Sequence, residues 1–139
     1  NQMYFVQNYD EIIPEPLVFE KSRLDFLLRY GGKDYCYIEV KTVTLSRKKN
    51  QAEFPDSVTV RGKKHLEHLV ALKALGFRAI QLFVVQRTDA STFSIAEDID
   101  QKYFNTIKRV RGLGIEIHVL KSHISRKGIM LGEPCPLLL

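Results

Sequence analysis

IEVK at residues 38–41 and SRLDF at residues 22–26 are the two stretches of sequence that decide the fold. Both are typical of β-strands, and the turn-rich stretch YGGKD at residues 30–34 lies between them. Cross-strand partners in an antiparallel hairpin share a constant sum of residue numbers. A turn centred within residues 30–34 therefore places Asp25 opposite Glu39.

Glu39 and Lys41 share one face of the second strand, because successive side chains of a strand alternate between its faces. Val40 lies on the other face. We expect Asp25, Glu39 and Lys41 to converge on one patch of the sheet, and two carboxylates beside an ammonium group are the elements of a divalent-metal phosphodiester site. The alternative is a solvated strand face with a cross-strand ion pair worth roughly 0.2–1 kcal/mol.

The ligand chemistry favours a hard divalent cation, Mg²⁺ or Mn²⁺. Mg²⁺ takes oxygen ligands and keeps several waters, so one or two carboxylates and a substrate phosphate suffice. Asp25, Glu39 and the carbonyl oxygen of Val40 are the predicted metal ligands. The metal polarises the phosphoryl group and activates a water, while the Lys41 ammonium stabilises charge on the phosphate. Asp25, Glu39 and Lys41 are therefore the predicted catalytic residues.

The chain has 139 residues and a formal net charge of +5, a size that suits one domain over residues 1–139 with a real core. The basic balance favours polyanionic partners. No apolar run approaches the roughly 20 residues that span a membrane. The two cysteines form neither a metal-ligand spacing nor a disulfide framework. We therefore expect a reduced, cytoplasmic protein without a membrane partner, and the oligomeric state stays open.

The remaining segments alternate between strand and helix patterns, which predicts an α/β (α+β) domain with a mixed central sheet flanked by helices. Gly76 is a stop signal for a helix whose N-cap is Thr59 or Ser57. The apolar run AIQLFVV is typical of a central strand buried on both faces. The expected strands are 18–30, 36–45, 79–85, 115–119 and 128–131, the expected helices are 58–75 and 100–111, residues 1–17 are a lead-in segment or short helix, and residues 46–56 are a basic loop.

A second group of residues lies on the first predicted helix, where the spacing of Arg61, Lys64, His65 and His68 puts all four on one face. A helix N-terminus attracts phosphate, and a basic stripe reinforces that attraction. The alternative is a solvated cationic face. Aromatic residues do not interleave with the basic ones, so the sequence predicts no base stacking. The predicted nucleic-acid contacts, through phosphates, are Arg23, Arg47, Lys48, Lys49, Arg61, Lys64 and His65.

Four motifs occur in order along the chain: SRLDFLL (22–28), YIEVKTVTL (37–45), FPDSVTVRGKKHL (54–66) and FVVQR (83–87). Together they resemble the sugar fermentation stimulation protein A (SfsA) family over most of the chain. The resemblance implies a restriction-endonuclease-like domain of the PD-(D/E)xK type, in which Asp25 is the first acid and Glu39 and Lys41 form the ExK motif. It also implies non-specific DNA binding and a part in regulating sugar (maltose) utilisation. Family members carry an OB-like domain before this region, and we expect this chain to lack it.

Two functions of different class follow from these residues. The first is a Mg²⁺- or Mn²⁺-dependent nuclease that acts on DNA or RNA through Asp25, Glu39 and Lys41. The second is a non-catalytic DNA-binding regulator that keeps the nuclease fold. The intact trio of two acids and a lysine favours a site capable of chemistry, because a pure binder has no need of two carboxylates beside phosphate.

Overall fold

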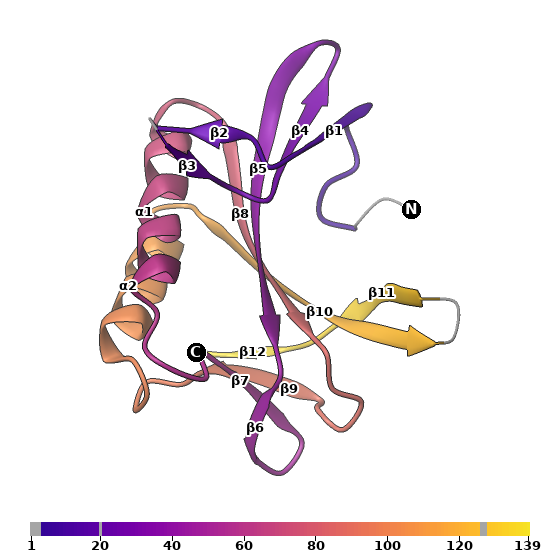
Figure 1. Ribbon diagram of the computed structural model, residues 1–139, viewed down its shortest axis with the longest axis vertical. Helices are drawn as coiled ribbons and strands as arrows, with labels where there is room; N and C mark the ends of the chain where they lie inside the picture. The colour runs from indigo at the N-terminus through magenta and orange to yellow at the C-terminus, as the bar shows by residue number, and fades with distance from the viewer. Residues whose placement is uncertain (1–3, 20, 126–127) are drawn as a thin grey trace.

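The computed structural model describes residues 4–19, 21–125 and 128–139, and its centre is a six-stranded sheet (Figure 1). Across the sheet the strands are β1 (Glu11–Pro14), β4 (Phe26–Tyr30), β5 (Lys33–Val43), β8 (Arg78–Val85), β10 (Glu116–Ser125) and β11 (Gly128–Pro134). The inner strands β5, β8 and β10 run parallel, whereas β1, β4 and β11 pair antiparallel with their neighbours. The sheet is mixed, as the sequence predicts, and β11 is an edge strand.

Two smaller sheets lie beside the central one. The first holds, in order, β12 (Leu137–Leu138), β9 (Thr92–Ile95), β7 (Gln51–Phe54) and β6 (Leu45–Lys48). The second is a short antiparallel hairpin of β2 (Leu17–Val18) and β3 (Ser22–Arg23). Figure 1 shows this hairpin beside the helix α1 (Val60–Ala74), with the β6–β7 hairpin at the opposite end of the molecule.

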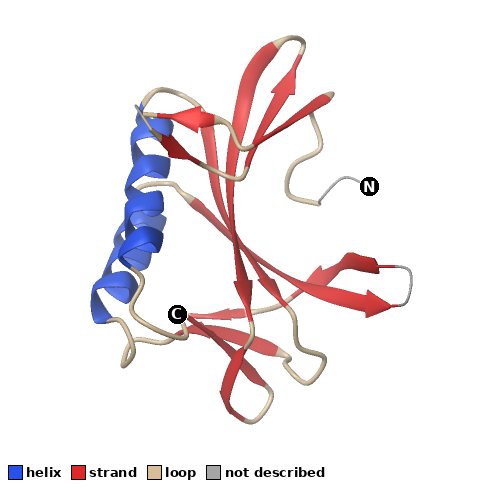
Figure 2. Ribbon diagram, in the orientation of Figure 1, coloured by secondary structure: helices blue, strands red, loops and turns tan. Residues whose placement is uncertain are grey.

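The helices α1 and α2 (Gln101–Gly112) both lie on one face of the central sheet (Figure 2). The Thr59 hydroxyl caps α1 by accepting a hydrogen bond from the N–H of Gly62. The chain leaves α1 through Gly76, whose φ of +102° suits glycine. The cap and the stop signal confirm the first predicted helix to within two residues at each end, and α2 confirms the second.

The central sheet separates two apolar clusters. On the helix side Val43 and Phe83 pack with Leu69 of α1, and on the other side Ile38 packs with Val6 of the N-terminal segment. The strand β8 is buried along nearly its whole length, as its apolar run predicts. No helix among the residues described is both long and apolar enough to cross a membrane.

Near the N-terminus, two segments of the structure differ from the prediction. The lead-in contains β1, which pairs with β4, and no helix occurs within residues 4–17; adjacent β-branched residues at 12 and 13 favour this strand. The single strand expected over 18–30 is divided into β2, β3 and β4. The division falls at Phe19, whose positive φ turns the chain back on itself.

The prediction of a basic loop over residues 46–56 is also wrong, because most of this segment forms the β6–β7 hairpin. Asn50, with φ of +62°, lies in the turn, a conformation that Asn tolerates better than most residues. The strand β9, which the sequence did not predict, pairs in parallel with β7. The hairpin is too polar to show the alternating apolar pattern by which a strand is predicted from sequence. Its strand β7 is stabilised instead by pairing with β9.

Candidate metal and phosphodiester site

Asp25 and Glu39 lie opposite each other across the β4–β5 hairpin. Phe26 pairs with Ile38, so continuing the same register sets Asp25 against Glu39, as predicted. Asp25 lies one residue before β4, and its Oδ2 accepts a hydrogen bond of 2.7 Å from the N–H of Val40. The Asp25 carboxyl therefore replaces a backbone partner at the end of the ladder and is anchored to β5.

Glu39 projects toward the helices and is only 3% exposed. Lys41 lies on the same face, with its Nζ 3.9 Å from Oε1 of Glu39. The Oε2 atom of Glu39 lies 3.2 Å from Nδ1 of His65, but no hydrogen bond forms there, and Oε2 is buried without a hydrogen-bond partner. A buried carboxyl oxygen without a hydrogen-bond partner costs folding free energy, so this atom is a candidate ligand for a bound cation.

His65 of α1 completes the group from the helix side. Its Nδ1 lies 3.1 Å from Nζ of Lys41. The sequence predicts His65 as a phosphate contact and gives no sign of its closeness to Lys41, because 24 residues separate the two. Packing of α1 on the sheet creates this contact.

Burial governs the protonation of the group. Burial and the neighbouring Asp25 carboxyl raise the pKa of Glu39 to about 9, against the pull of Lys41 and Arg61. Burial also lowers the pKa of Lys41. Burial and the positive charges of Lys41 and Arg61 lower the pKa of His65 to about 4. Near neutral pH, therefore, Glu39 holds a proton and His65 is neutral, so that Nδ1 of His65 accepts from Lys41 and its own proton lies on Nε2.

Gln81 and Tyr103 are two buried polar residues near Glu39. Gln81 is fully buried beside Glu39 in the β5–β8 register, and its Nε2 donates to the carbonyl oxygen of Glu39 at 3.1 Å. The Oε1 of Gln81 and the hydroxyl of Tyr103 are buried without hydrogen-bond partners. Neither residue is among the site residues predicted from the sequence, although Gln81 stands out as the one polar residue in the run AIQLFVV.

The donor set fits a hard divalent cation. Two carboxyl groups face one another, and one of them has a buried oxygen without a hydrogen-bond partner. A bound cation would supply a partner for that oxygen and would offset the repulsion that arises between the two groups when Glu39 ionises. Among the described residues no three His, Cys, Asp or Glu side chains form a ready metal cluster. Asp25 and Glu39 would therefore hold the cation with water and a backbone oxygen, an arrangement that suits Mg²⁺ better than Zn²⁺. The carbonyl of Val40 as that backbone ligand stays a prediction.

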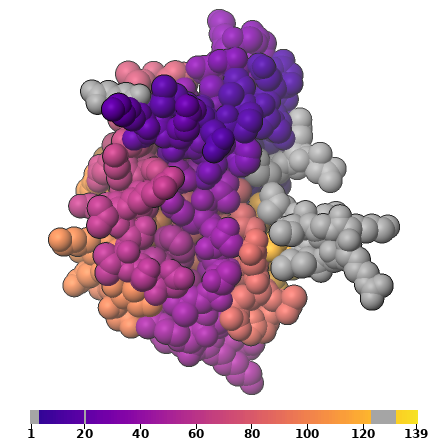
Figure 3. All heavy atoms as spheres, in the orientation of Figure 1, coloured from indigo at the N-terminus to yellow at the C-terminus, as the bar shows by residue number. Residues whose placement is uncertain are grey.

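A cavity of about 380 Å³ adjoins this group, and His65 belongs to both. Figure 3 shows the N-terminal residues, in indigo, packed against the upper part of the magenta segment that contains α1. No carboxylate within the described residues lies at ion-pair distance from Lys21, Arg61 or Lys64. The lining residues are Lys21, Ser22, Arg23, Arg61, Lys64 and His65. Four of the predicted phosphate contacts, Arg23, Arg61, Lys64 and His65, are therefore brought together.

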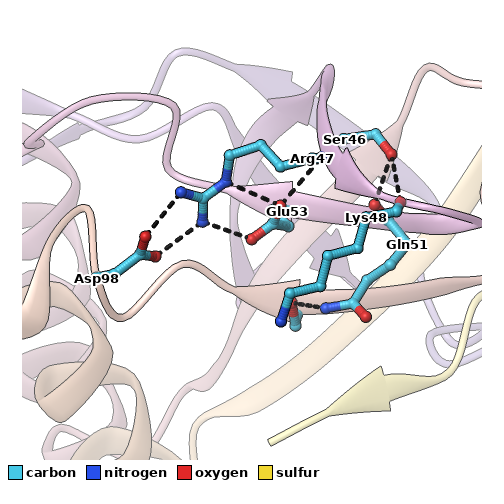
Figure 4. Close-up of polar contacts among 7 residues, drawn as sticks. Ser46, Arg47, Lys48, Gln51, Glu53 and Asp98 are labelled. Carbon is cyan, nitrogen blue, oxygen red and sulfur yellow. Dashed lines mark hydrogen bonds and ion pairs between the residues drawn. The ribbon is translucent and has the colours of Figure 1, made fainter.

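The other three predicted phosphate contacts lie elsewhere. Arg47 donates to Glu53 and to Asp98, each at 2.7 Å, and both carboxylates engage its guanidinium (Figure 4). Lys48 and Lys49 are exposed on the β6–β7 hairpin. A larger cavity of about 770 Å³ opens beside Arg47, but its arginine is paired with Glu53 and Asp98, and neither Asp25 nor Glu39 lines it. We therefore place the candidate site at the smaller cavity.

A mixed sheet with a parallel centre, two acids opposite each other at the end of a hairpin and a lysine two residues after the second acid define a restriction-endonuclease-like domain. The family model described as the sugar fermentation stimulation protein RE domain matches residues 1–128. The chain belongs to that family, SfsA.

Relatives and a solved structure agree with the assignment. The chain is 46% identical over 125 residues to a sugar fermentation stimulation protein homolog of Ruegeria pomeroyi, covering 90% of this chain and 54% of the relative. The homolog of Roseobacter denitrificans is 44% identical over 134 residues, covering 96% of this chain and 57% of the relative. The chain thus spans about half the length of the curated relatives it matches.

The structure of Pyrococcus furiosus SfsA in complex with Ca²⁺ superposes with a TM-score of 0.80 at 30% sequence identity, covering 91% of this chain and 54% of that one. The likeness extends over nearly all of this chain, and the restriction-endonuclease-like fold predicted from sequence is confirmed.

Proposed function

We propose that this domain binds nucleic acid through its phosphates, without sequence preference, and hydrolyses phosphodiesters with a divalent cation held by Asp25 and Glu39. The observation that carries the proposal is the unpaired, buried Oε2 of Glu39, which lies beside a second carboxyl group and a lysine. The cation cluster of the adjoining cavity supports it, because phosphates are the anions such a cluster attracts. The Ca²⁺ complex of the Pyrococcus relative supports a divalent cation without selecting Mg²⁺ or Mn²⁺.

Each side chain has a separate task in this proposal. Arg61 and Lys64 hold the phosphates that flank the reacting one. A divalent cation supplies Lewis-acid polarisation of the phosphoryl oxygen and lowers the pKa of a bound water. The Lys41 ammonium, oriented by its contact with Nδ1 of His65, stabilises the negative charge that develops on the phosphate. Glu39 gives up its proton when it acts as a ligand.

A non-catalytic DNA-binding regulator of sugar (maltose) metabolism is the second candidate. One observation favours it: the Lys41 ammonium is already engaged by His65 and Glu39. In that case the carboxyl pair takes no part in catalysis, whether or not it binds a metal, and the phosphate contacts carry the function.

A metal titration with Mg²⁺, Mn²⁺ and Ca²⁺ separates the two functions when binding is followed by calorimetry and cleavage of labelled DNA and RNA is followed in parallel. Cleavage with Mg²⁺ or Mn²⁺ supports the nuclease. Metal binding with DNA binding but no cleavage supports the regulator. Absence of metal binding refutes the proposed metal site.

The cavity cations are expected to set the salt dependence of DNA binding. Arg61→Gln combined with Lys64→Gln should make the negative slope of log K against log salt shallower by roughly 1.8, because each phosphate contact on duplex DNA contributes about 0.9 to its magnitude. The matched control is Lys63→Gln with Lys73→Gln, which removes the same charge from exposed positions of α1 outside the cavity lining. Equal slopes for the two double variants, measured by fluorescence anisotropy at several salt concentrations, would exclude the cavity as the phosphate track.

A further inference from the structure

Phe19 is an aromatic residue held in an unfavourable conformation at the surface. Its φ is +43°, in the left-handed region that costs a non-glycine residue roughly 1–2 kcal/mol. The turn is closed by a hydrogen bond of 3.2 Å from the N–H of Ser22 to the carbonyl oxygen of Phe19. Although phenylalanine is normally buried, this side chain is 41% exposed. The fold thus maintains both backbone strain and an exposed apolar ring at one position.

The ring of Phe19 begins a row of three rings that leads to the carboxyl pair. It lies 5.4 Å from the ring of His68, which in turn lies 6.4 Å from the ring of His65. His65 contacts Lys41 and approaches Glu39. The row follows α1, and only its first member comes from another element, the β2–β3 turn.

The same turn supplies part of the cation-lined cavity. Ser22, the donor that closes the Phe19 turn, lines the cavity, and so does Lys64, one helical turn from His68. The cavity volume of about 380 Å³ is near the low end of small-ligand pockets, roughly 300–1,000 Å³, a size that suits one nucleotide and is too small for a duplex. Positive charge beside an exposed aromatic ring matches an anionic ligand that also has a flat π-face.

We propose that Phe19 is a stacking platform for an unpaired nucleobase, and that the adjoining cavity holds the phosphate of that nucleotide on Arg61 and Lys64. The inference rests on the proposed function and narrows its substrate class to nucleic acid with unpaired bases, a single strand or a frayed end. The sequence predicts no stacking, because about 40 residues separate Phe19 from Arg61 and Lys64 in the chain. Folding of the β2–β3 hairpin against α1 brings it to them.

The chain has no tryptophan, so Phe19→Trp introduces a single tryptophan at the proposed platform, whose fluorescence can be excited selectively at about 295 nm. The probes are an oligothymidylate of about 12 nucleotides, an abasic oligomer of the same phosphate number, and a blunt duplex, all within site sizes of roughly 4–16 nucleotides. Stacking predicts that oligothymidylate quenches the fluorescence of the Phe19→Trp variant and that the abasic oligomer and the duplex do not. Tyr30→Trp, at a position 60% exposed at the far end of β4, is the control and should respond to none of them.

Affinity gives the second measurement. Phe19→Ala should weaken oligothymidylate binding roughly 5- to 150-fold, as expected for one base–aromatic stack, and change abasic binding less than about twofold. Phe19→Tyr keeps a ring and should retain most of the affinity. Because the side chain is exposed, none of these variants threatens the core.

The outcomes are distinguishable. Two results would overturn the stacking platform and leave the proposed function standing. One is equal quenching of the Phe19→Trp variant by oligothymidylate and the abasic oligomer. The other is unchanged affinity of Phe19→Ala for oligothymidylate while the wild type binds with a normal salt slope. Failure of the wild type to bind any of the three probes at low salt overturns both. Base-dependent quenching of the Phe19→Trp variant together with the loss of affinity in Phe19→Ala establishes the platform.

Discussion

Glu39→Gln is expected to abolish measurable divalent-cation binding and to lower metal-dependent cleavage by roughly 10²–10³-fold. The buried carboxyl oxygen that a cation needs is replaced by an amide, and loss of several kcal/mol of charge stabilisation corresponds to that factor, at about 1.4 kcal/mol per tenfold. The fold should survive, because Glu39 holds a proton near neutral pH and glutamine has the same shape as the protonated acid. Single-turnover cleavage and Mn²⁺ calorimetry measure the two effects.

Asp25→Asn should reduce metal binding and cleavage by a similar factor. The hairpin should be preserved, because the amide oxygen of the new side chain can still accept a hydrogen bond from the N–H of Val40. The matched control is Glu97→Gln, an exposed carboxylate outside the candidate site that should leave metal binding and cleavage unchanged. If Glu39→Gln and Asp25→Asn both bind metal and cleave like the wild type, the two carboxyl groups only stabilise the hairpin.

The metal-free protein is expected to lose stability as the pH rises from about 6.5 to 9. Native Glu39 keeps its proton up to about pH 9, whereas the unfolded chain releases it near the ordinary value of 4.5, so the native state binds the extra proton and this contribution falls with rising pH. His65 has the opposite sign: its pKa is lowered from 6.5 to about 4, so its contribution rises with pH between those values. The two largely cancel below pH 6.5.

Above that point the Glu39 contribution dominates, at about 1.4 kcal/mol per pH unit and on the order of 3 kcal/mol in total. Lys41, with a lowered pKa, reduces the loss at the alkaline end. Urea unfolding at about pH 6.5, 7.5 and 8.5 measures how the free energy of unfolding changes with pH. The difference between wild type and Glu39→Gln separates the contribution of Glu39 from that of other titrating groups. Parallel stability curves for the two proteins would show that Glu39 is ionised in the native state at neutral pH.

The same linkage predicts that metal affinity rises with pH. A cation bound by Glu39 displaces its proton, so the apparent affinity should increase up to about tenfold per pH unit below pH 9, with about one proton released on binding. Calorimetry of Ca²⁺ or Mn²⁺ binding in buffers of different ionisation enthalpy counts that proton. Affinity independent of pH would mean that Glu39 is not a ligand.

Local signals carried most of the correct structural predictions. The β4–β5 hairpin, the limits of α1 at Thr59 and Gly76, and the buried strand β8 depend on turn residues, caps and periodicity within a few residues. The errors lie where pairing is remote. The strands β1 and β9 are short, and each becomes a strand only because a partner elsewhere in the chain supplies its hydrogen bonds.

The sequence by itself determined that Asp25 faces Glu39 and that Lys41 shares their side, because the two-residue period of a strand and a short turn are local properties. Only the tertiary structure decided how these groups behave. Packing of α1 and α2 buries Glu39 and sets His65 against Lys41, and burial, not the ExK spacing, changes their proton affinities. Likewise, Arg47 is engaged by carboxylates from remote segments, and Phe19 reaches the basic cavity through the β2–β3 turn. Charge and dielectric depend on neighbours in space, and most of those neighbours lie far apart in the chain.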